Sequence, residues 1–171
     1  MERVQRVLSH PDFDAYMFLN KQQETGREFC CHQLEHALDV ARIFYILCLE
    51  GDRTGSLPDL KELSGQETKE LVYAIALLHD IGRWKQYLDR SLDHASEGAV
   101  LARPILQDAG FNDREIDLAL KAIAAHRDSQ APGLGSFLYR ADKLSRNCHH
   151  CPAQDKCYKF NRMETRDKLL Y

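Results

Sequence analysis

The sequence predicts an all-α protein, folded as a compact bundle of about six or seven helices of ordinary length. Apolar residues recur at three- and four-residue steps through most of the chain, and no segment alternates at period two as a half-buried strand would. The 171 residues suit one domain with a core of its own, so we expect a single domain over residues 1–171.

The first two long helices are indicated by an apolar face and by the residues at their ends. Apolar residues share a face between positions 34 and 48, and Gly51 is expected to end that helix. Ser64, with Glu67 three residues later, forms a capping-box pattern ahead of a second apolar face that ends at His79.

Two further helices carry the same kind of signal. A third apolar face covers positions 99–109 and is closed by Gly110. Asn112 and Glu115 form another capping-box pattern, and the fourth helix then places apolar residues of positions 116–123 on one face. The two ends of the domain, before position 21 and after position 133, are also expected to be helical, with loops at 51–57, 87–93, 128–135 and after 147.

Composition excludes several classes of protein. The 23 Lys and Arg residues against 26 Asp and Glu give a formal charge of −3, which argues against extended binding of nucleic acid on a basic face. The longest strongly apolar run, 73–78, is far shorter than the roughly 20 residues that cross a bilayer. The first residues lack the apolar stretch of a secretory signal, so we expect a cytoplasmic protein without a membrane partner.

Several histidine and aspartate residues lie within or at the ends of the predicted helices. They fall within or at the ends of apolar faces, where an unpaired polar group is costly. Imidazole and carboxylate groups brought together from several helices form a typical site for a divalent transition metal. The candidate ligands are His36, His79, Asp80, His94, His126 and Asp142.

Three of the segments that carry these residues resemble the HD superfamily of metal-dependent phosphohydrolases, whose signature is H…HD…D. They are LEHALDVAR with His36, LLHDIGR with His79 and Asp80, and ADKLSR with Asp142. Two more, DHASEGA with His94 and AIAAHRD with His126, resemble the histidines of the subset that holds two metals. The resemblance covers residues 30–146, leaving 147–171 as a C-terminal extension, and implies an HD-like helical fold.

The resemblance also implies a ligand set. A first metal is expected on His36, His79, Asp80 and Asp142, and Asp80 is expected to bridge to a second metal on His94 and His126. In the alternative, one metal binds and the last two histidines contact phosphate. The metals expected are one or two divalent ions of Fe, Mn, Zn, Ni or Co.

The implied activity is hydrolysis of a phosphoester or phosphoanhydride by a hydroxide that the metals activate. The expected substrate is a small phosphorylated metabolite, with a nucleotide as the first candidate. Asp80, Arg83 and Lys143 are the expected catalytic residues, and Arg127 and Arg146 either contact phosphate or point to water at helix ends. Two other functions stay open: a di-iron oxygenase of the same superfamily, and a non-catalytic module that senses nucleotide or metal.

Three more side chains near the motifs have open roles. His32, four residues before His36, is expected on the same helix face, where it contacts substrate, orients a ligand or is an ordinary surface residue. Trp84 and Tyr87 either stack on a nucleobase or pack as lids of the core.

The C-terminal extension contains a separate candidate site. Cys148, Cys151 and Cys157 form a C-x2-C-x5-C pattern, in which the first spacing suits two ligands of one metal. Three interpretations of this pattern stay open: a structural zinc ion, an iron–sulfur cluster and unligated thiols. A further ligand would have to come from a residue elsewhere in the fold or in the same segment: Cys30, Cys31, His149 or His150.

Overall fold

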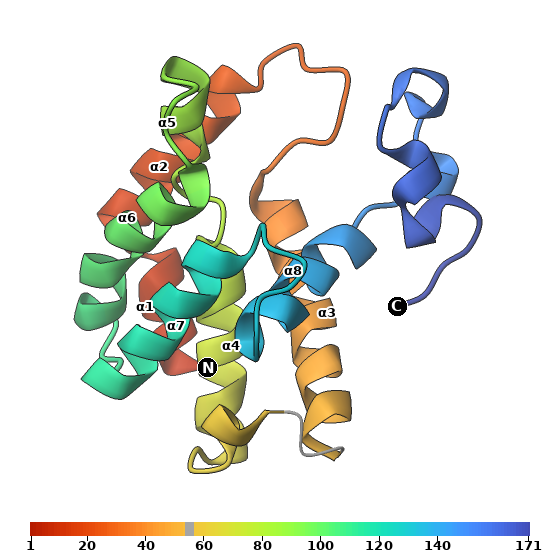
Figure 1. Cartoon of the computed structure of the whole chain (residues 1–171). Helices are drawn as coiled ribbons and strands as arrows, with labels where there is room; N and C mark the ends of the chain where they lie inside the picture. The colour runs from red at the N-terminus through yellow and green to blue at the C-terminus, as the bar shows by residue number, and fades with distance from the viewer. Residues whose placement is uncertain (54–56) are drawn as a thin grey trace.

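The all-α prediction is confirmed. The computed structural model describes residues 1–53 and 57–171, and within these ranges it contains helices and no strand (Figure 1). The α-helices are α1 (Glu2–Leu8), α2 (Pro11–Gln23), α3 (Leu34–Arg53), α4 (Gly65–Leu78), α5 (Arg83–Leu88), α6 (His94–Asp108), α7 (Asp113–Ala125) and α8 (Leu134–Leu144). Short 3-10 turns cover Pro58–Leu60, Cys148–His150, Gln154–Lys156, Phe160–Arg162 and Glu164–Arg166.

Helix α4 is the centre of the bundle. It packs against α1, α3, α6 and α7, and its second half is apolar on every side, as expected of a helix that neighbours surround (Figure 1). Both predicted capping boxes are present. The Glu67 amide donates to Ser64 Oγ at 3.3 Å and the Glu115 amide donates to Asn112 Oδ1 at 3.0 Å. The capping boxes therefore fix where α4 and α7 begin, and each helix is followed directly by a site residue, His79 or His126.

Helix α1 is joined to the bundle by a buried ion-pair network. The Arg3 guanidinium lies 2.6 Å from a carboxylate oxygen of Glu70 on α4 and 2.7 Å from one of Glu115 on α7. Both carboxylates are almost fully buried, so each needs this partner to offset its desolvation.

The predicted end of the first long helix at Gly51 is wrong, because α3 continues to Arg53. A Cβ on Gly51 would lie 2.5 Å from the ring of Phe137 on α8. The glycine therefore lets α3 and α8 pack closely and does not end α3. The loop expected at 51–57 lies partly outside the described residues.

The C-terminal extension forms a separate lobe beside the segment that joins α2 to α3 (Figure 1). Its described structure consists of 3-10 turns, and its buried residues are few: Cys148, Ala153 and Thr165. Lys156 Nζ of this lobe contacts Glu28 of the joining segment at 2.6 Å. Among the described residues, no helix is long and apolar enough to span a membrane.

Candidate metal centre

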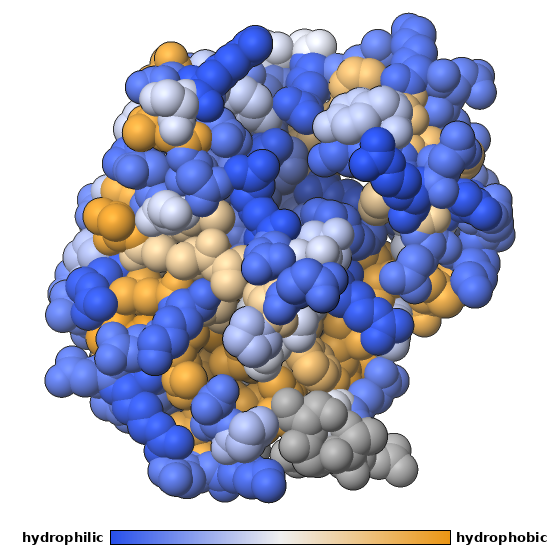
Figure 2. Space-filling model, in the orientation of Figure 1, coloured by the Kyte–Doolittle hydropathy of each residue, from blue (hydrophilic) through white to orange (hydrophobic). Residues whose placement is uncertain are grey.

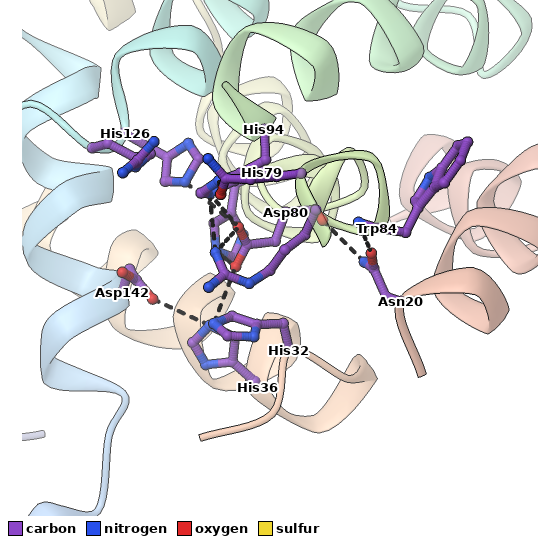
Figure 3. A network of polar contacts seen from close by, with 12 residues as sticks. Asn20, His32, His36, His79, Asp80, Trp84, His94, His126 and Asp142 are labelled. Atoms are coloured by element: carbon purple, nitrogen blue, oxygen red, sulfur yellow. Dashed lines mark hydrogen bonds and ion pairs between the residues drawn. The ribbon is translucent and has the colours of Figure 1, made fainter. Parts of the chain in front are cut away.

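The predicted histidines and aspartates meet where several helices begin or end (Figure 3). His79 directly follows α4, His126 directly follows α7, and His94 is the first residue of α6. His36 lies in the first turn of α3 and Asp142 lies near the end of α8. Residues far apart in the sequence therefore point into one space between helix ends.

Their donor atoms form two groups that share Asp80. In each group, one ligand atom per residue lies within 4.8 Å of all the others. The first group is His36, His79, Asp80 and Asp142, and the second is Asp80, His94 and His126. The structure thus brings together both sets of expected ligands, and each set could hold a metal ion.

The contacts of Asp80 explain why it belongs to both groups. Its Oδ2 lies 3.2 Å from Nε2 of His79, whereas its Oδ1 lies 3.1 Å from Nε2 of His94 and 3.6 Å from Nε2 of His126. The two oxygens of one carboxylate therefore face different imidazoles, which places Asp80 in both donor groups.

Each imidazole of the site is held in the same orientation by an acceptor behind it. His79 Nδ1 donates to Ala76 O at 2.6 Å, and His126 Nδ1 donates to Ile123 O at 2.7 Å. His94 Nδ1 lies 2.7 Å from Gln86 Oε1, and His36 Nδ1 lies 3.2 Å from Ser145 Oγ, whose hydroxyl donates to the Asp142 carbonyl. Because a carbonyl only accepts, the proton belongs on Nδ1, and the Nε2 lone pair is directed into the site.

Two atoms at the centre also lack a hydrogen-bond partner among the described residues. They are His79 Nε2 and Asp80 Oδ1, both buried from solvent. Unpaired buried nitrogen and oxygen atoms are costly in a folded protein, whereas a cation between them would satisfy both. The donor set and these two atoms therefore fit a divalent transition metal.

Burial and neighbouring charges set the protonation states that metal binding needs. Burial lowers the pKa of His36 to about 4 and lowers that of His94. Burial opposes ionisation of Asp80 and Asp142, but the imidazoles of His79 and His36 outweigh it and hold both carboxyl pKa values well below the usual range. His79 differs, because the Asp80 charge outweighs its burial and raises its pKa. A cation would take the place of that proton.

His32 lies beside the centre, but not where the sequence pattern placed it. Helix α3 begins at Leu34, so His32 precedes the helix, and it is 7% exposed rather than on the surface. Its Nε2 lies 3.9 Å from Asp80 Oδ2, and its Nδ1 is hydrogen-bonded to a carboxylate oxygen of Glu24. The surface interpretation is therefore wrong, and the side chain faces the site.

Sequence reasoning missed Glu24 and Asn20, both buried at the end of α2. The Glu24 carboxylate contacts the His32 ring at Nδ1, and it also accepts the His32 backbone amide at 2.6 Å. Asn20 Nδ2 donates to the Asp80 carbonyl at 3.0 Å, and its Oδ1 accepts the Trp84 amide at 2.8 Å (Figure 3). Helix α2 has no clear apolar face, so the sequence carried no signal for either contact.

Backbone contact between two glycines brings α6 to the centre. A Cβ on Gly82, just after the His79–Asp80 pair, would lie 2.5 Å from the Gly98 amide nitrogen and 2.7 Å from the His94 carbonyl oxygen. No side chain fits there. The first turn of α6, with His94, can therefore lie directly against the turn that follows α4.

The predicted cations are arranged around the carboxylates. Arg83 Nη1 lies 3.2 Å from His94 Nε2 and 3.8 Å from Asp80, and Lys143 contacts Asp142. Arg146 Nη2 lies 2.8 Å from His36 Nε2 and 3.1 Å from Asp142. Arg127 instead pairs with Asp93, at 2.5 Å, on the rim.

A cavity of about 300 Å³ opens from this centre, and Figure 2 shows the face hollowed between the bundle and the C-terminal lobe. Its aromatic lining comes from Phe29 and Tyr158. Trp84 is not part of this lining and stacks on Tyr16, with ring centroids 6.4 Å apart. The lining includes six basic residues: Arg27, Arg83, Arg127, Lys143, Arg146 and Lys159.

The fold and the site define a helical domain with a cluster of histidines and aspartates that could hold a metal. Residues 34–147 match the family model described as "HD domain". An uncharacterized protein of Clostridium beijerinckii is 36% identical over 157 residues, which are 92% of this chain and 92% of the relative. A search of solved structures gave no significant match.

The chain therefore belongs to the HD domain family. This is a superfamily of metal-dependent phosphohydrolases, and its domains bind divalent metals. The resemblance of the sequence motifs to this family is confirmed.

Proposed function

We propose that the protein is a phosphohydrolase with two divalent metals, which cleaves a phosphoester or phosphoanhydride of a small metabolite. The observation that carries this proposal is the shared carboxylate of Asp80, on which imidazole lone pairs converge inside a cavity with a basic lining. His36, His79, Asp80 and Asp142 would hold one ion, and Asp80, His94 and His126 the other. When bound, two such ions supply Lewis acidity at phosphoryl oxygens and a water of lowered pKa.

The chain's own residues then bind and orient the phosphate. Arg83 lies within 4 Å of Asp80, and Lys143 contacts Asp142, so both cations stand at the edge of the donor groups. Two basic residues of the cavity, Arg27 and Lys159, have no ion pair with a carboxylate in the described part of the chain. An anionic substrate would supply that partner, and more than one phosphate would use several of these cations.

A nucleotide is the substrate class that suits the remaining surface of the cavity. Phe29 and Tyr158 offer aromatic rings on the same lining as the basic side chains. A base can stack on such rings while its phosphate reaches the donor groups. The volume of about 300 Å³ lies at the lower end of the range for small-molecule sites, which favours a mononucleotide.

The proposal is tested by measuring the hydrolysis products of phosphomonoesters, phosphodiesters and nucleotides with Mn²⁺, Co²⁺ or Fe²⁺. Asp80→Asn removes the charge that both donor groups share, so we expect loss of both bound ions and a fall in turnover of at least 100-fold. Asp117→Asn, at an exposed position that pairs with Arg103, is the matched control and should keep full activity. Unchanged turnover in Asp80→Asn would remove the mechanism, and dependence on iron with consumption of O₂ would replace it with oxygenase chemistry.

A further inference from the structure

Four cysteines from two distant segments line one cavity beside the metal centre. Cys148, Cys151 and Cys157 belong to the C-terminal lobe, and Cys30 belongs to the segment between α2 and α3. The cavity has a volume of about 420 Å³. Cys31, the neighbour of Cys30, is not part of its lining, and its thiol instead contacts the Phe29 carbonyl.

The spacing of these thiols is wider than a single zinc ion requires. Zinc holds thiolates at about 2.3 Å, so in a tetrahedral site the sulfur atoms lie about 4 Å from one another. Among the described residues, no three donor atoms of this cysteine group lie within 4.8 Å of one another. An iron–sulfur cluster places iron and sulfide between its four thiolates and therefore holds them farther apart.

The four thiols share the lining of this one cavity, although they come from two segments far apart in the sequence. Four thiolates around one space repel one another unless cations lie between them. Phe29, Pro152 and Phe160 also line the cavity and would shield such a group from water.

The C-terminal lobe also lacks a core of its own. It consists of 3-10 turns with few buried residues, and segments of this size usually need a disulfide or a metal to hold their fold. All six cysteines of the chain are free thiols, so no disulfide supplies that constraint.

From this geometry we propose that Cys30, Cys148, Cys151 and Cys157 bind an iron–sulfur cluster that holds the C-terminal lobe to the α2–α3 segment. The cluster is distinct from the histidine and aspartate centre, which contains no thiolate ligand. Cys30, rather than Cys31, supplies the ligand that the C-x2-C-x5-C pattern does not contain.

The cluster would also shape the substrate cavity. Cys30, Cys148 and Cys157 line both cavities, and Tyr158 and Lys159, which follow Cys157 directly, line the one at the metal centre. Loss of the cluster would therefore displace an aromatic ring and a cation that contact substrate. This consequence rests on the proposed function, whereas the presence of the cluster does not.

The test is reconstitution of the full chain with sulfide and a mixture of ferrous and ferric iron without oxygen, in competition with zinc. We expect at least about two acid-labile sulfides per chain and the broad visible absorption of a cluster. Because sulfide is measured, iron in the histidine and aspartate centre does not affect the result, and an inactive protein would still report on the cluster. Zinc without sulfide in the wild-type protein would overturn the proposal.

Single variants identify the ligands. Cys30→Ser and Cys148→Ser should lose most of the sulfide and the visible absorption, and Cys31→Ser, the matched control, should keep both. His150→Ala should also keep both, although His150 lines the same cavity. Equal sulfide in Cys30→Ser and Cys31→Ser, with circular dichroism like that of the wild type, would refute the assignment of Cys30.

Discussion

Glu24 is the buried group whose removal gives the clearest test of how the site is built. Its side chain is fully buried and accepts the His32 amide at 2.6 Å, the Tyr87 hydroxyl at 2.8 Å and the Nδ1 proton of His32. Glu24→Gln keeps the shape but replaces one acceptor oxygen with an amide NH₂. At least one of the three donors then faces another donor, which costs free energy in a buried site.

The expected loss of stability follows from the pKa of Glu24. Burial raises this pKa, but the hydrogen bond from His32 and the charge on its ring outweigh burial and lower it from 4.5 to about 2. That difference corresponds to about 3 kcal/mol, and to about 2 kcal/mol after allowance for solvent screening. A loss of about 2 kcal/mol lowers the Tm of a chain of this length by about 4–8 °C.

The lowered pKa of Glu24 also determines how its contribution to stability changes with pH. Because the folded pKa is depressed, the stabilisation by Glu24 is fully present above pH 4.5 and is lost as the pH falls towards 2. The difference in Tm between wild type and Glu24→Gln should therefore be largest at neutral pH and shrink in acid.

The assay is thermal unfolding of the metal-free protein, followed by circular dichroism at pH 7 and at pH 3. Glu28→Gln is the matched control, because Glu28 is half-exposed and its pair with Lys156 is a surface salt bridge of small value. Equal Tm values at pH 7 for wild type and Glu24→Gln would refute the reasoning that a buried charge on Glu24 holds His32.

Three further predictions use other contacts of the fold. Gly82→Ala should push the first turn of α6 away from the turn that follows α4, and because His94 then moves, metal affinity should fall about 10- to 100-fold. A calorimetric Mn²⁺ titration of the variant that matches the wild type would contradict this. The free energy of unfolding of the metal-free protein should rise with pH between about 4 and 6.5, because burial lowers the pKa of His36 from 6.5 to about 4 and the unfolded chain binds more protons there. Urea unfolding across this pH range measures the rise, and His36→Gln should flatten it. Glu115→Gln should cost about 3 kcal/mol and lower Tm by about 6–12 °C, because Arg3 loses a buried partner; a shift below about 2 °C would show that the pair contributes little.

The candidate ligands could be predicted from the sequence because each sits at a helix end that local signals define. His79 follows a capped apolar face and His126 follows another, so their places at the ends of α4 and α7 agree with the prediction. The predicted end of α3 at Gly51 is wrong for a non-local reason. Gly51 is required by the ring of Phe137, and a contact across the bundle leaves no trace in the local pattern.

The supporting residues could not be predicted, because their roles depend on elements that meet only in the folded chain. Glu24 and Asn20 lie on a helix without a clear apolar face, yet one holds His32 and the other holds the Asp80 backbone. The choice between Cys30 and Cys31 is similar, since adjacent residues are equivalent in sequence but only Cys30 lines the cysteine cavity.

The sequence by itself determined the helical class, the order of the helices and the residue types able to bind a metal, because these follow from periodicity, capping and donor chemistry. Only the tertiary structure decided which donor atoms share Asp80 and which ring nitrogen each histidine turns inward. It also placed His32 against a buried carboxylate rather than on the surface. The physical reason is that burial and orientation arise from packing between distant segments, such as the Gly82–Gly98 contact, which no local pattern encodes.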